Sequence, residues 1–331
     1  MPLDTTNPAT LMSGRFRRDQ IPPLKGRTAV VTGGSAGIGY YAALNLARAG
    51  AKVHILSSTP EHGMKAEHEM NEEAKMAGGS VTFHQVDFGD LRQVDQVAKE
   101  LAKEDRLDIL INNAGVGQGP HGFTKDGLES HFQVNNLAHW LLTVRLLPLM
   151  QKTVSIAPPA SVRICDQSSE LHRAAPPDTQ FASKEEIQEK RDPNRLYGRS
   201  KLGMILLGRQ IIKRYPAVRD NILVTAVHPG TVDTDLQEGW AETYGVAGKI
   251  ADVVMRKVGK SAEEGAEACL WAATSTDITP ENFKEFQGNY YSEPYGKPGT
   301  ETDQAKDEAL GDRFWALCQL TAAEILGEHV A

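Results

Sequence analysis

The sequence predicts an α/β fold: a single doubly wound domain in which helices cover both faces of a parallel sheet of about seven strands. Apolar segments with strand character alternate with helical segments over residues 25–331, as is typical of a parallel sheet. The first unit, residues 28–50, joins a short β-branched strand, a glycine-rich turn and an apolar helix in immediate succession. Such a unit is the outline of a dinucleotide site.

The glycine-rich turn supports this interpretation. Gly33, Gly37 and Gly39 stand where a side chain would obstruct a tight turn or a closely approaching phosphate. The helix is expected to start near Ile38, and its unpaired backbone N–H groups can hold a pyrophosphate without a basic side chain. An ordinary strand-to-helix corner is the alternative for the turn taken alone.

Composition limits the function classes. The 331 residues are 40% hydrophobic and 24% charged, so the chain can bury a large core. A formal charge of -7 without a dense basic block argues against nucleic acid as a partner. Three widely spaced cysteines indicate neither a disulfide framework nor a metal site. Residues 1–24 are expected to form a loose N-terminal arm, and no transmembrane segment is expected, which predicts a soluble, cytoplasmic protein.

The later strands and helices follow in order. Strands are expected at residues 28–31, 52–56, 81–86, 107–111, 161–169, 221–227 and 288–292. The main helices between and after them are expected at residues 61–76, from about 91, at 125–151, around 197–201 and at 307–317.

The end of the second strand bears on the cofactor. An acidic residue at this place binds ribose hydroxyls and repels the additional phosphate of NADP. Here Ser57, Ser58 and Thr59 follow the strand, and hydroxyl groups can donate to a 2′-phosphate. The sequence therefore favours NADP(H) over NAD(H).

The strongest chemical pattern is a tyrosine followed four residues later by a lysine, Tyr197 and Lys201. Residues four apart lie on one face of a helix, so both side chains can enter one cleft. A phenol with an ordinary pKa of about 10 transfers protons poorly near neutrality, and a nearby cation favours its phenolate. Lys201 can supply that cation.

Six motifs in order resemble the short-chain dehydrogenase/reductase family, which adopts a Rossmann fold, and its retinol-dehydrogenase-like branch. They are TGGSAGIG from residue 32, NNAG from 112, VN at 134–135, SS at 168–169, YGRSK from 197 and PGTVDT from 229. The resemblance covers residues 25 to 327. It implies hydride transfer with NAD(P), with Tyr197 exchanging the proton of a carbonyl or alcohol.

The resemblance also implies roles residue by residue. Ser169, rather than Ser168, would hydrogen-bond the substrate oxygen, Lys201 would support Tyr197, and Asn135 would hold a water in the proton relay. The residues implied or expected to bind the cofactor are Gly33, Ser35, Gly37, Ile38, Gly39, Ser57, Ser58, Asp87, Phe88, Asn113, Ala114, Gly115, Tyr197, Lys201, Pro229, Gly230, Val232 and Thr234. Asp87 as a helix cap, Asn135 as a structural residue at a helix kink and His228 as a structural residue are the alternatives.

Substrate recognition is expected in two insertions, near residues 170–195 and 236–262. Apolar residues of the second suggest a lipophilic carbonyl or alcohol as the small-molecule substrate, although they could equally be packing residues, and a surface insertion is the alternative for the first. A secondary metabolite or xenobiotic carbonyl is as plausible as a lipid. The resemblance also includes a dimer surface, at Leu202, Ile205 and Leu206, so a homodimer is possible.

No metal is expected, and His62 is interpreted as a surface residue. A noncatalytic NADP(H)-binding regulator is the alternative function; an epimerase or a methyltransferase fits the motifs less well.

Overall fold

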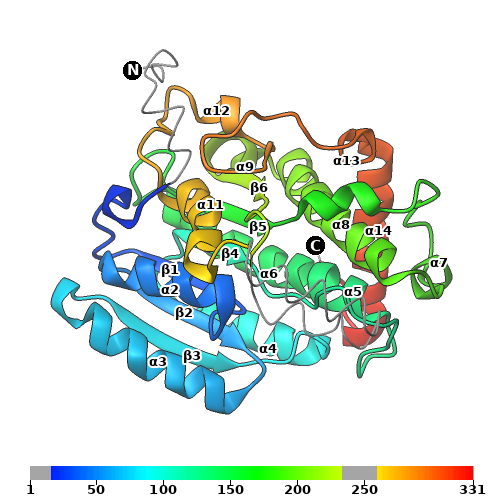
Figure 1. Cartoon of the computed structure of the whole chain (residues 1–331), viewed down its shortest axis with the longest axis horizontal. Helices are drawn as coiled ribbons and strands as arrows, with labels where there is room; N and C mark the ends of the chain where they lie inside the picture. The colour runs from blue at the N-terminus through cyan, green and yellow to red at the C-terminus, as the bar shows by residue number, and fades with distance from the viewer. Residues whose placement is uncertain (1–15, 233–258, 331) are drawn as a thin grey trace.

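A parallel seven-stranded sheet forms the centre of the computed structural model, which describes residues 16–232 and 259–330 (Figure 1). The strand order is β3-β2-β1-β4-β5-β6-β7. The strands are β1 (Thr28–Thr32), β2 (Lys52–Ser57), β3 (Ser80–Gln85), β4 (Ile109–Asn112), β5 (Arg163–Gln167), β6 (Leu223–Val227) and β7 (Tyr290–Tyr291). The predicted fold class is confirmed, and the order reverses between β1 and β4, where doubly wound folds bind their ligands.

Helices cover both faces of the sheet (Figure 1). The larger ones are α2 (Gly37–Arg48), α3 (Pro60–Ala74), α4 (Leu91–Leu101), α6 (Ala138–Val154), α8 (Pro193–Arg214), α11 (Ala262–Thr274) and α14 (Glu308–Leu326). Shorter elements are η1 (Arg18–Gln20), η2 (Lys75–Ala77), α5 (Ser130–Phe132), η3 (Gln133–Leu137), η4 (Glu170–Ala174), α7 (Lys184–Gln188), α9 (Pro216–Asn221), α12 (Phe283–Phe286) and α13 (Asp303–Lys306).

Side-chain alternation along the strands divides the core into two clusters. In β1, Ala29 and Val31 face the cluster shared with α2, α3 and α11, whereas Val30 faces the cluster shared with α4, α6, α8 and α14. Every residue of β1 is buried, as expected for a strand covered on both faces. The two faces of the sheet are therefore covered, and a binding site has room only at the ends of its strands.

One predicted helix differs in the structure. The helix expected at residues 125–151 starts at Ser130, because the Glu129 carboxylate accepts from the backbone N–H groups of His131 and Phe132 and fixes the first turn there. Its first part then widens into a π-helical turn, Gln133–Leu137, before α6 continues to Val154. Such turns are often found at functional sites.

The N-terminal arm is not loose over its described part. The side chains of Phe16 and Leu24 are 2% and 1% exposed, and the Phe16 ring lies 6.4 Å from that of Tyr295. Burying two large apolar side chains holds residues 16–24 on the domain. Residues 1–15 lie outside the described part.

The predicted dimer surface on α8 is wrong in its residues. Leu202, Ile205 and Leu206 are each at most 1% exposed and belong to the core shared with α6 and α14. The C-terminal helix α14 packs beside α8. Its Trp315 ring also lies 5.4 Å from the Trp140 ring of α6. This packing keeps the α8 leucines inside the chain.

Candidate active site

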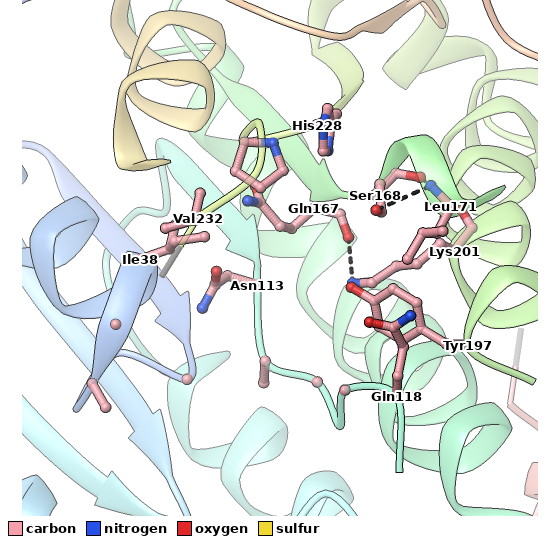
Figure 2. Close-up of a pocket in the computed structure, with 18 of the residues that line it drawn as sticks. Ile38, Asn113, Gln118, Gln167, Ser168, Leu171, Tyr197, Lys201, His228 and Val232 are labelled. Atoms are coloured by element: carbon pink, nitrogen blue, oxygen red, sulfur yellow. Dashed lines mark hydrogen bonds between the residues drawn. The ribbon is translucent and has the colours of Figure 1, made fainter. Parts of the chain in front are cut away.

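A cleft of about 660 Å³ opens at the carboxyl ends of the strands (Figure 2). Most of the predicted site residues line it. They are Gly33, Ser35, Gly37, Ile38, Ser57, Asn113, Ala114, Gly115, Ser169, Tyr197, Lys201, Pro229, Gly230 and Val232. Gly39, Ser58, Asp87, Phe88 and Asn135 are not among the lining residues, and Thr234 lies outside the described residues.

The glycine turn has the geometry that its sequence predicts. Gly33 and Gly37 have φ values of +65° and +55°, which favour glycine. A Cβ on Gly39 would lie 2.2 Å from the Gly33 carbonyl oxygen, so only glycine lets α2 approach the strand. The residue before α2 is Ala36, whose methyl side chain cannot cap the first turn. The N–H groups at this helix start therefore face a cradle that fits a dinucleotide pyrophosphate.

The NNAG segment connects β4 to β1. The Thr32 hydroxyl accepts from the backbone N–H groups of Asn113 and Ala114, at 2.8 Å each, and the Asn113 amide donates to the Thr32 carbonyl oxygen at 2.9 Å. The Thr32 hydroxyl also lies 2.9 Å from His139 Nε2. Burial lowers the pKa of His139 to about 3, so the imidazole is neutral and serves the structure. These bonds fix the floor of the cleft.

Hydroxyl groups line the cleft at the end of β2. The Ser35 and Ser57 hydroxyls lie 2.6 Å apart, and Thr59 and His62 line the same end of the cleft. His62 is exposed, as expected for a surface residue, and it also lines the cleft because α3 starts at Pro60 and brings its first turn there. Ser58 is exposed and is not among the residues that line the cleft.

Asp87 and Phe88 lie beside the cleft rather than in its lining. The Asp87 carboxylate accepts from the Gly89 N–H at 2.8 Å and pairs with Lys125 at 2.9 Å. The helix-cap alternative for Asp87 is wrong, because the side chain that caps α4 is that of Asp90. The expected contact of Asp87 with the cofactor stays a prediction.

Asn135 lies in the π-helical turn and is 1% exposed. Its side-chain oxygen accepts from the Val116 N–H at 2.8 Å, and its amide donates to the Val116 carbonyl and to the Ser200 hydroxyl. It therefore joins the loop after β4 to α8, two elements of the cleft wall. The expected role of Asn135 in holding a water stays a prediction.

The hydroxyl groups of the neighbouring residues Ser168 and Ser169 have different partners. The Ser168 hydroxyl turns toward α8 and donates to the Lys201 carbonyl oxygen at 2.8 Å. The Ser169 hydroxyl accepts from the Leu171 N–H at 3.2 Å, and it lies near enough to the Tyr197 phenol to act to lower the pKa of that group. Of the two, Ser169 is the serine beside Tyr197.

Tyr197 and Lys201 share the cleft wall on α8 (Figure 2). The Lys201 ammonium lies 5.5 Å from the Tyr197 ring centre and donates to the Gln167 backbone oxygen at 2.9 Å. Burial raises the pKa of the Tyr197 phenol to about 12 and lowers the pKa of Lys201 to about 8. In this state the phenol holds its proton and the ammonium is charged at neutral pH.

The sequence did not single out several lining residues. Gly117, Gln118, Gln167, Glu170 and Leu171 also face the cleft. The Glu170 carboxylate accepts from the Tyr290 hydroxyl and Arg173, which holds it in place, and the Gln118 amide donates to Asn194. The wall near Tyr197 is therefore partly polar. No motif marks these residues, because chain folding brings them to the cleft.

His228 ends β6 and is half-buried at the cleft. Burial lowers its pKa to about 4, so the imidazole is neutral at pH 7 and is no proton donor there. The structural role of His228 stays a prediction. The following turn is fixed by the backbone bond from Lys260 to Thr231, at 2.8 Å.

The insertion at 170–195 divides into two parts. Glu170 and Leu171 line the cleft. Farther along, the buried Phe181 ring packs 5.1 Å from Phe314 of α14, and the Ile187 carbonyl accepts from Arg199 of α8. Only the start of this insertion forms a cleft wall, while the rest packs on the helices. The insertion near 236–262 lies mostly outside the described residues.

In the described ranges, 16–232 and 259–330, no helix has both the length and the apolar composition needed to cross a membrane. A cytoplasmic location stays a prediction.

Comparisons with known proteins agree with this geometry. Residues 27–157 match a family model described as short chain dehydrogenase. The chain is 35% identical to the mitochondrial bli-4 protein of Neurospora crassa, over 93% of this chain and 74% of that protein. It is 30% identical to mouse retinol dehydrogenase 14, over 90% and 86% of the two chains. A Beutenbergia cavernae structure described as an NAD(P) dependent gluconate 5-dehydrogenase, with NADP bound at low occupancy, has a TM-score of 0.58 and 25% identity, covering 81% and 95%.

Proposed function

This chain belongs to the short-chain dehydrogenase/reductase family, whose members are oxidoreductases, and we propose that it interconverts a lipophilic carbonyl and its alcohol with NADP(H). The observation that carries the proposal is the arrangement of Ser169, Tyr197 and Lys201 around one cleft. A noncatalytic nucleotide-binding protein would have no need of this arrangement.

The cleft fits the cofactor. Gly33 and Gly37 take the positive φ values of a phosphate-binding turn, and only glycine at position 39 lets α2 start so close to the Gly33 carbonyl oxygen. The Ser57 and Thr59 hydroxyls, with the His62 ring, would receive the 2′-phosphate of NADP(H), and no carboxylate follows β2 before Glu61. When bound, NADP(H) donates or accepts the hydride.

The chain's own residues handle the proton. In reduction, the Tyr197 phenol gives its proton to the carbonyl oxygen, and the Ser169 hydroxyl hydrogen-bonds that oxygen as negative charge develops. The Lys201 ammonium lies close to the Tyr197 ring and stabilises the phenolate that is left. In oxidation the same phenolate takes the proton of the alcohol.

The substrate class rests on less specific features. Leu171 gives the wall beside Ser169 an apolar surface, and the similarity to a retinol dehydrogenase supports an apolar alcohol or its carbonyl. Glu170 and Gln118 add hydrogen-bonding groups, which favours a lipophilic molecule that also carries a polar substituent.

Two measurements test the proposal. NADPH should raise the melting temperature of the protein more than NADH at the same concentration, and the opposite order would overturn the NADP(H) preference. Loss of NADPH absorbance should then be followed with aromatic, steroid and aliphatic ketones and aldehydes, and gain of NADPH absorbance with NADP⁺ and the corresponding alcohols. Binding of NADPH without turnover in any of these would favour the noncatalytic alternative.

A further inference from the structure

The side chain of Gln167 is the most unusual polar group in the cleft. It is 4% exposed, and both its amide nitrogen and its amide oxygen are buried without a hydrogen-bond partner among the described residues. A buried amide without partners costs about 1–3 kcal/mol or more for each unsatisfied group. Packing alone would favour an apolar residue here, such as Val227, which is the residue paired with Gln167 on β6.

The backbone and the side chain of Gln167 face different parts of the cleft. The Gln167 backbone oxygen accepts from Lys201, and its side chain extends to the opposite side, toward Val232 and Ile38 (Figure 2). The alternation of β5 explains this direction. Asp166 faces α8, where a Cβ on Gly208 would lie 3.0 Å from its carboxylate, whereas Gln167 faces the other side of the sheet.

Val232 and Ile38 close this side of the cleft. A Cβ on Gly265 of α11 would meet a Val232 methyl at 2.7 Å and a side-chain carbon of Ile38 at 3.1 Å, so both side chains pack against the backbone of α11 there. The amide of Gln167 therefore extends toward two apolar side chains of the cleft wall (Figure 2). A ligand group that enters here meets one free donor and one free acceptor.

We propose that the Gln167 side chain hydrogen-bonds the carboxamide of the nicotinamide ring, an inference that rests on the proposed function. The carboxamide has one oxygen acceptor and one NH₂ donor, the complement of the glutamine amide. Such a pair satisfies both unpaired atoms. Because Lys201 holds the backbone of the same residue, Gln167 couples the orientation of the ring to the proton-transfer pair.

Gln167→Met tests the inference, because methionine has a similar length and no amide. The substitution should lower the affinity for NADPH roughly ten-fold, the loss expected for two hydrogen bonds of modest strength. Affinity for 2′,5′-ADP, which lacks the nicotinamide, should stay within about two-fold. The melting temperature without ligand should be equal or higher, because an unpaired amide is removed.

A ligand variant isolates the carboxamide. The 3-acetylpyridine analogue of NADP⁺ keeps the acceptor oxygen but replaces the NH₂ donor with a methyl group. The natural chain should prefer NADP⁺ over this analogue by several-fold, and Gln167→Met and Gln167→Leu should lose most of that preference. Gln118→Met, which removes a different amide from the cleft, should keep it.

The outcomes separate the two hypotheses. If the natural chain binds NADPH and Gln167→Met binds it equally well, or if NADPH and 2′,5′-ADP are weakened alike, the role of Gln167 is wrong and the proposed function stands. If the natural chain binds neither NADPH nor NADH, both are wrong. A fall in the melting temperature of both Gln167 variants without ligand would point to a structural amide and overturn the inference.

Discussion

The Lys201 ammonium lies 5.5 Å from the centre of the Tyr197 ring, one helical turn away on α8. Both side chains are buried, so their charges are weakly screened by water. Burial raises the pKa of the phenol and lowers that of the ammonium, which leaves a protonated tyrosine beside a lysine that titrates near pH 8.

Tyr197→Phe should reduce turnover by about 10²–10⁴-fold, the usual contribution of a general acid or base. The phenyl ring keeps the packing on α8, so NADPH affinity and melting temperature should change little. Initial rates of NADPH oxidation with a carbonyl found in the substrate screen measure the effect. Turnover near that of the natural chain would rule out Tyr197 as the proton donor.

The two neighbouring serines form a matched pair. Ser169→Ala should lower the reduction rate by about 10²-fold, because the developing oxyanion loses a hydrogen-bond donor. Ser168→Ala removes a buried bond to the Lys201 carbonyl and should cost about 1 kcal/mol of stability with a smaller effect on rate. Rates and urea unfolding midpoints of both variants check the assignment, which reversed effects would contradict.

The reduction rate should depend on pH through Lys201. Its pKa is lowered to about 8, so the ammonium is charged below that pH and loses its charge as the pH rises through it. The phenol, with its pKa raised, stays protonated over this range. The rate of reduction should therefore be flat near pH 6–7 and fall above about pH 8. A rate that climbs from pH 7 to 9 would be inconsistent with this role.

Gly39→Ala tests the cradle. The added Cβ would lie 2.2 Å from the Gly33 carbonyl oxygen and 2.5 Å from the Asn113 amide, so α2 must move away from the turn. NADPH binding and the melting temperature should both fall, although alanine usually stabilises a helix by about 1 kcal/mol relative to glycine. Gly119→Ala, whose Cβ would have its nearest neighbour at 4.0 Å, is the control and should leave both unchanged.

Asp166 makes the stability of the protein depend on pH. Burial raises the pKa of this carboxyl to about 7 from an ordinary value of 3.8. The folded state therefore binds a proton that the unfolded state releases, and stability is lost as the pH rises from about 4 to 7, at up to about 1.4 kcal/mol per pH unit. Asp166→Asn removes this dependence, so it should be more stable than the natural chain at pH 8 in urea unfolding and should lose the advantage at pH 4.

For the insertion after β5, residues 170–195, the sequence could not predict which residues face the cleft. The patterns at 170–195 suggested a pocket wall, yet only Glu170 and Leu171 face the cleft. Phe181 packs on Phe314, more than one hundred residues later in the chain. Contacts of this kind depend on how helices dock, and local periodicity carries no information about docking.

Local sequence patterns were sufficient to predict the fold class and the placement of Tyr197 and Lys201 on one face of a helix. Glycine at positions 33, 37 and 39, the strand periodicity, and the four-residue spacing of Tyr197 and Lys201 act over one or two turns of chain, so the sequence determines them directly. Only the tertiary structure decided that Ser168 bonds to α8, that the α8 leucines are covered by α14, and that the amide of Gln167 is buried without a partner. Each of these depends on segments far apart in the sequence, and their burial is set by packing of the whole domain.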